Sequence, residues 1–218
     1  MIAYKFLASG AVGPFTGFRW PTAGAGAPGS WVAAVDGRAD HGIHACVASD
    51  LAFWLHEELW AAELENPVRM GHRQVIGSRG RLIERVTGWS SAVAREFAEA
   101  CAWRARDRFL VALRKASLEA GADRLASARD LVQLRRASDA LRARGAPSVA
   151  TAASSYLREA IETLDAGDAP VSAYISARAA VAASGGKESE FGTEREEQGW
   201  WLARRLGLGG SSSEAGRS

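Results

Sequence analysis

The chain has 218 residues, 47% of them hydrophobic and 24% charged, which is the composition of a globular protein with one large or two small cores. Its formal net charge is only +2 and both halves of the sequence are nearly neutral, which argues against nucleic acid or an anionic membrane as a partner. No stretch approaches the roughly 18 apolar residues of a membrane span, and the start lacks a signal-peptide pattern. We therefore expect a cytoplasmic protein.

The first half of the sequence has the pattern of short strands. Three apolar runs separated by Gly and Pro predict strands at 3–7, 15–20 and 31–35. The segment 42–47 predicts another strand, after which Ser49 or Asp50 is placed to cap one or two helical turns through Leu55. Alternating residues predict a further strand at 59–64. Residues 73–86 predict two strands that are joined as a hairpin at the break 77–80.

From Ser90 onward, apolar residues recur at helical spacing. A long first helix is expected to end at Gly121, and four more helices follow it. We therefore predict an α+β protein: a β-rich unit over 1–88, a mostly helical region over 89–206, and a Gly/Ser-rich, disordered tail over 207–218.

Three of the four histidines lie close together along the first half of the chain, next to one of the two cysteines. These side chains, His41, His44, Cys46 and His56, are the candidate ligands of a zinc ion, which takes four such ligands in closed sites. None of the familiar zinc-ligand spacings is present, and Cys46 and Cys101 are too few for a disulfide framework. We therefore favour no metal, with hydrogen-bonded histidines and reduced thiols as the expectation.

On a strand, His44 and Cys46 point to the same face because side chains alternate. Trp54 and Trp60 are close in sequence and are candidates to wall a pocket for a flat ligand. These four residues are the predicted ligand-binding set, and His44 with the carboxylates of Glu63 and Glu84 is the predicted catalytic set. All of the candidates fall in the β-rich unit.

Residues 42–46 read Gly-Ile-His-Ala-Cys, with Tyr4-Lys5 before them and a short helix and an acidic strand after them. This pattern resembles a group of uncharacterised bacterial and phage proteins that contain Gly-[Ile/Phe]-His-Ala-Cys. The resemblance covers about the first 85 residues and implies no activity.

The order of elements is also similar to the middle of ADP-ribosyltransferases of the poly(ADP-ribose) polymerase type. In those enzymes Gly-Ile-Tyr-Phe leads into a short helix and a strand reading Glu-Val-x-Leu-Gly, and residues 42–45 and 62–65 occupy these places here. The resemblance implies that NAD is used, that His44 replaces the tyrosine that stacks on nicotinamide, and that Glu84 is the catalytic glutamate. Residues 4–6 read Tyr-Lys-Phe where the transferases have His-Gly-[Ser/Thr].

We expect a binding or accessory protein that holds a small molecule or a partner protein through the β-rich unit. The alternative is an enzyme in which His44 shares a cleft with Glu63 or Glu84, with NAD-dependent transfer as its most specific form. NAD and zinc both stay open as cofactors, and neither is favoured. The helical region suits assembly with a second copy of the chain or with a partner.

Overall fold

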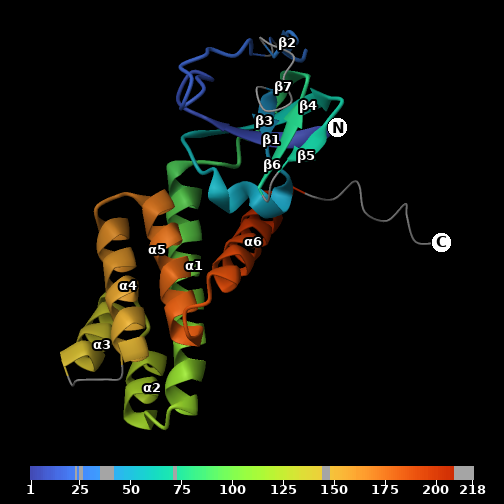
Figure 1. Cartoon of the computed structure of the whole chain (residues 1–218). Helices are drawn as coiled ribbons and strands as arrows, with labels where there is room; N and C mark the ends of the chain where they lie inside the picture. The colour runs from blue at the N-terminus through green and yellow to red at the C-terminus, as the bar shows by residue number, and fades with distance from the viewer. Residues whose placement is uncertain (23, 25–26, 35–41, 71–72, 144–147, 209–218) are drawn as a thin grey trace. The chain divides into compact units, whose positions relative to one another are not determined.

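The computed structural model describes residues 1–22, 24, 27–34, 42–70, 73–143 and 148–208. His41 and residues 209–218 of the predicted tail lie outside these ranges. The strands precede residue 86 and the α-helices follow residue 90 (Figure 1), which confirms the predicted α+β class. No helix within the described ranges is long and apolar enough to cross a membrane.

The chain divides into two compact units. The β-rich unit comprises Met1–Ser91 and the residues from Glu196 onward, and the helical unit comprises Ala92–Arg195. The division therefore falls inside the last helix, so that the β-rich unit is built from both ends of the chain.

The first sheet of the β-rich unit has four strands in the order β1-β4-β7-β2, and all its pairs are antiparallel. Their bounds are Ile2–Leu7 (β1), Glu58–Glu65 (β4), Arg79–Arg85 (β7) and Val32–Ala33 (β2). Strand β4 is buried along nearly its whole length, as its central position between β1 and β7 requires.

The second sheet has three antiparallel strands in the order β3-β6-β5. Their bounds are Ile43–Ala45 (β3), Gln74–Gly77 (β6) and Val68–Met70 (β5). The two sheets meet where Tyr4 and Cys46 exchange backbone hydrogen bonds of 2.8 Å in both directions. They meet again where β6 continues into β7 through Ser78.

The predicted hairpin between residues 73 and 86 is wrong, although both of its strands exist. Strand β6 pairs with β3 and β5, whereas β7 pairs with β4 and β2, so the chain passes straight from one sheet to the other. The Ser78 amide donates to the Glu65 oxygen, and the Ser78 oxygen accepts from the Ala34 amide. Neighbouring segments thus satisfy the backbone hydrogen-bonding groups at the glycine-rich break, so the chain does not have to turn back on itself there.

Two other local predictions also differ from the structure. Residues 15–20 form no strand and pair only through an isolated bridge between Val12 and Arg19. The turns after β3 form a 3-10 helix, η2 (Ala48–Phe53), that starts after Val47 without a side-chain cap. Asp50 does not cap it, because its side chain is buried and 3.8 Å from the Arg73 guanidinium.

The core of the β-rich unit lies on the inner faces of its strands. One cluster joins Leu7, Trp60 and Leu82, and a second joins Ala3, Ala45 and Leu64, while Ile43 packs against both. The end of the last helix contributes to the same unit. There Gly199 lies so close to the Ser49 oxygen that a Cβ would overlap it, and Leu202 is fully buried.

Six helices make up the second half of the described chain. They are α1 (Ser91–Lys115), α2 (Glu119–Ala126), α3 (Leu131–Ala143), α4 (Ser148–Asp165), α5 (Ala169–Ser184) and α6 (Glu188–Arg205). The prediction that the first helix ends at Gly121 is wrong. The break lies between Lys115 and Glu119, and Gly121 is inside α2, where a Cβ would meet the Leu141 side chain at 2.6 Å. This glycine permits close packing and does not end a helix.

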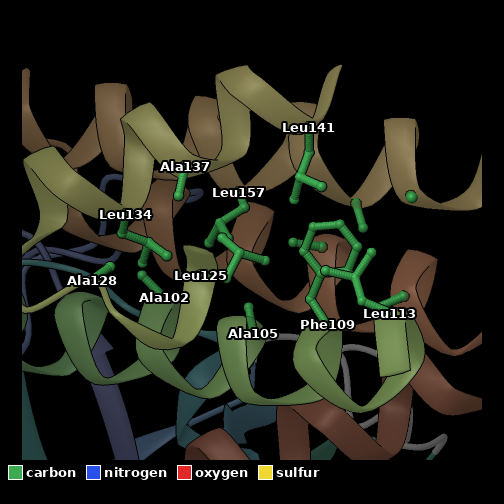
Figure 2. Packing of buried hydrophobic residues seen from close by; sticks show 14 of the residues in the cluster. Ala102, Ala105, Phe109, Leu113, Leu125, Ala128, Leu134, Ala137, Leu141 and Leu157 are labelled. Carbon is green, nitrogen blue, oxygen red and sulfur yellow. The ribbon is translucent and has the colours of Figure 1, made fainter. Parts of the chain in front are cut away.

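The core of the helical unit is one cluster of buried side chains from α1 to α5. Phe109 of α1 belongs to it together with Leu125 of α2, Leu141 of α3 and Leu157 of α4 (Figure 2). Many of the other members are alanines, which let helix backbones approach closely. Each unit therefore has a hydrophobic core of its own.

Candidate functional site

Two adjoining cavities open on the β-rich unit. The larger has a volume of about 480 Å³ and the smaller a volume of about 90 Å³. Both are lined by Lys5, Pro14, Phe15, His44 and Trp54. Because these five residues are shared, we treat the two hollows as one site and call it the Lys5 cavity.

The walls of the Lys5 cavity are mostly apolar and aromatic. Its larger part is also lined by Phe18, Trp20 and Ile43. Phe15 and Phe18 are 87% and 44% exposed, so the loop before β2 presents two aromatic rings to solvent at the cavity. An apolar hollow with a few convergent polar groups is the usual form of a small-molecule site.

Lys5 reaches the cavity because it occupies an inner position of β1. Residues alternate between the faces of a strand, so Lys5 shares its face with Ala3 and Leu7, which are both fully buried. Sequence reasoning missed this lysine, yet a signal was present: a single cation interrupts an otherwise apolar face of the first strand. Lys5 is one of only three lysines in the chain.

The Lys5 amine has few polar partners. Its Nζ donates to the His44 backbone oxygen at 2.6 Å and lies 5.0 Å from the centre of the Trp20 ring. Among the described residues, no carboxylate forms an ion pair with it. Burial lowers the pKa of Lys5 to about 8, although the nearby Cys46 opposes this shift.

His44 lies on β3 beside Lys5 and lines both parts of the cavity. Its Nδ1 is 2.9 Å from Oε1 of Gln74 on the neighbouring strand β6. Because that oxygen only accepts, Nδ1 is the donor in this hydrogen bond. Gln74 therefore helps to orient the ring.

Trp54 follows η2 and forms another wall. Its Nε1 donates to the Arg73 backbone oxygen at 2.7 Å, which satisfies the only polar atom of the indole. Arg73 is itself held by Glu196 at 2.9 Å and stacks over the Phe53 ring at 3.9 Å. The Trp54 ring is thus positioned by contacts outside the cavity.

Cys46 lines the smaller part of the cavity and is only 1% exposed. Burial raises the pKa of its thiol, and the carboxylate of Asp50 adds to this effect, while Lys5 opposes it. Cys46 is therefore a neutral thiol that acts as a small apolar wall, and not a thiolate nucleophile.

The other predicted site residues do not line the Lys5 cavity. Trp60 is in the core and donates from Nε1 to Glu58, Glu63 pairs with Arg81 at 2.6 Å, and Glu84 is exposed on β7. The structure thus brings together His44, Cys46 and Trp54, adds Lys5, and leaves both glutamates outside.

The candidate zinc ligands that the structure describes are not grouped into a metal site. His56 does not line the cavity that contains His44 and Cys46, and His41 lies outside the described residues. Within the described ranges, no three His, Cys, Asp or Glu side chains are grouped closely enough to hold a metal ion.

We compared the chain with protein-family models, with curated protein sequences and with solved structures, and found no match.

Proposed function

We propose that this chain is a cytoplasmic binding protein whose β-rich unit holds a small, flat and largely apolar molecule in the Lys5 cavity. The observation that carries the proposal is a hollow of about 480 Å³ in which aromatic side chains surround Lys5 and His44. This volume lies within the range of about 300–1,000 Å³ that is common for sites of small ligands.

The exposed aromatic rings support a ligand site. Phe15 is 87% exposed and Phe18 is 44% exposed, and a ligand in the cavity would remove part of this apolar surface from water. The base of their loop is held in place, because Glu58 accepts hydrogen bonds from the backbone of Gly10 and Ala11. A fixed base keeps the rings near the cavity before a ligand arrives, which lowers the ordering cost of binding.

The enzyme alternative finds less support. An NAD-using transferase that resembles the poly(ADP-ribose) polymerase type would need a glutamate beside His44. Neither Glu63 nor Glu84 lines the cavity, and Glu63 is engaged by Arg81. We therefore propose binding and not group transfer.

Titration with the neutral fluorescent probe N-phenyl-1-naphthylamine tests the proposal. We expect one saturable site with a micromolar dissociation constant. Ala33 lines the cavity from the exposed end of β2, so Ala33→Trp should fill part of the hollow and weaken binding at least tenfold.

The matched control is Val68→Trp, which adds the same ring at an exposed position of β5 that does not line the cavity. This variant should bind the probe as the unaltered chain does. The proposal fails if the unaltered chain shows no saturable binding, or if Ala33→Trp binds as tightly as Val68→Trp.

A further inference from the structure

We infer that the ligand of the Lys5 cavity is an anion: a flat apolar molecule with a carboxylate or a similar anionic oxygen group, which pairs with the Lys5 amine. This inference rests on the proposed binding function and names the chemical class of the ligand. The juxtaposition that carries it is a lysine amine, a tryptophan face and a set of aromatic walls in one hollow.

The hydrogen-bonding capacity of Lys5 supports the inference. An ammonium group has three N–H donors, and the described structure uses one of them on the His44 oxygen at 2.6 Å. The Trp20 face at 5.0 Å attracts the positive charge but accepts no conventional hydrogen bond. An oxygen of a bound molecule would satisfy a remaining donor.

The charge balance of the cavity points the same way. A half-buried cation is normally paired, but no described carboxylate forms an ion pair with Lys5. Burial lowers its pKa to about 8, so the amine is still mostly protonated at pH 7. A charge-assisted hydrogen bond to an anion would be strong in such apolar surroundings.

Among the residues that the structure describes, the other titratable groups that line the cavity carry no competing negative charge near neutral pH. They are His44 on β3, Cys46 directly after that strand, and Tyr4 next to Lys5. Burial raises the pKa of both Tyr4 and Cys46, so both stay neutral. Lys5 is thus the group whose charge decides the binding of an anion there as the pH rises from 7.

Two probes that differ by one charged group test the inference. 8-Anilinonaphthalene-1-sulfonate has the ring system of N-phenyl-1-naphthylamine plus a sulfonate. At pH 7 the unaltered chain should bind the sulfonate at least tenfold more tightly than the neutral probe. Lys5→Met should remove this preference, so that its affinities for the two probes lie within about twofold of each other.

Controls locate the effect at the cavity. Lys115→Met removes an exposed lysine of the helical unit and should leave both affinities unchanged. Ala33→Trp should weaken both probes. If Lys5→Met does not fold by circular dichroism, the unaltered chain still tests the inference, because its preference for the sulfonate should fall about tenfold between pH 7 and pH 9.5 as Lys5 loses its charge.

The outcomes separate the two proposals. If neither probe binds, the binding function fails, and the inference fails with it. If the neutral probe binds and the sulfonate binds no more tightly, the binding function stands and the inference is overturned. It is also overturned if folded Lys5→Met keeps the preference, if the preference persists at pH 9.5, or if Ala33→Trp still binds the sulfonate normally.

Discussion

Glu58 is a buried carboxylate that anchors the loop carrying Phe15 and Phe18. It accepts hydrogen bonds from the Gly10 amide at 3.2 Å, the Ala11 amide at 3.1 Å and the Trp60 indole at 3.0 Å. Gly10 and Ala11 both have positive φ angles, of 77° and 58°. The carboxylate therefore stabilises a turn that alanine in particular rarely adopts.

We predict that Glu58→Gln lowers the free energy of unfolding of the β-rich unit by about 2 kcal/mol, because charge-assisted hydrogen bonds at a buried site are weakened. Urea denaturation followed by tryptophan fluorescence measures this loss. Glu84→Gln is the control, since Glu84 is exposed on β7, and it should change the stability by less than about 0.5 kcal/mol. Equal effects of the two substitutions would contradict the role of Glu58.

The effect of Glu58→Gln should depend on pH. Burial by itself would raise the pKa of Glu58, but the hydrogen bonds from Trp60, Gly10 and Ala11 and the charge of Arg85 outweigh it and lower the pKa. A lowered pKa stabilises the folded state above the unfolded-state pKa of about 4.3, and the stabilisation is lost as the pH falls through the folded-state pKa. The difference in free energy of unfolding between Glu58→Gln and the unaltered chain should therefore be full at pH 7 and shrink as the pH falls below about 4. If this difference stays constant down to pH 2.5, the charge of Glu58 does not stabilise the fold.

Among the elements, α5 has the most clearly marked ends. Asp168 precedes it, and its Oδ1 accepts from the Val171 amide at 3.1 Å, while Pro170 lies in the first turn. At the other end Gly185 adopts a left-handed conformation with a φ of 107°, and the Gly186 amide donates to the Val181 oxygen at 2.9 Å. These capping features favour a helix that begins directly after Asp168 and ends directly before Gly185.

We predict that Asp168→Ala destabilises the helical unit by about 1 kcal/mol, the usual cost of removing an N-cap side chain. Thermal or urea unfolding followed by circular dichroism at 222 nm measures the change. Glu159→Ala replaces an exposed acidic residue within α4 and should have almost no effect. If Asp168→Ala leaves the free energy of unfolding unchanged, the hydrogen bond to Val171 contributes nothing to stability.

The elements that sequence patterns predict well are those with local signals. Helix α5 has a proline in its first turn and a glycine directly after its last residue, and α4 repeats its apolar residues at helical spacing. The predictions from sequence are wrong where a residue that usually marks a turn or a helix end is instead required by packing against a distant part of the chain. Gly121 resembles a helix end but accommodates Leu141, and the glycine-rich break beside Ser78 resembles a hairpin but links two sheets.

The candidate site was predictable in part for the same reason. Alternation on a strand places His44 and Cys46 on one face, and both line the Lys5 cavity. Lys5 lies almost 40 residues earlier in the sequence, and only the meeting of β1 with β3 brings it to His44. The partners of the two glutamates likewise depend on strand register, which a single sequence does not reveal.

At the scale of the whole molecule, each unit has a separate core, so a core substitution in the helical unit should act on that unit. Phe109 is 2% exposed at the centre of the cluster in Figure 2, whereas Val111 on the same helix is 68% exposed. We predict that Phe109→Ala lowers the free energy of unfolding of the helical unit by about 3–5 kcal/mol, as is typical when a buried phenylalanine is truncated.

Circular dichroism at 222 nm during urea unfolding measures this cost, because the helical unit holds most of the helical residues. Val111→Ala on the same helix is the matched control and should change the stability by less than about 0.5 kcal/mol. A cost below about 1 kcal/mol for Phe109→Ala would mean that the cluster is not a tightly packed core.

The division of the chain inside α6 has a consequence for how the protein is made. The β-rich unit needs residues from Glu196 onward, which a ribosome adds only after the roughly one hundred residues of the helical unit. At about 5–20 residues per second, the strands would wait for about 5–20 s before their last segment is synthesised. The helical unit, although encoded second, is the first whose residues are all available, and the unit that begins the chain is the last that can complete its fold.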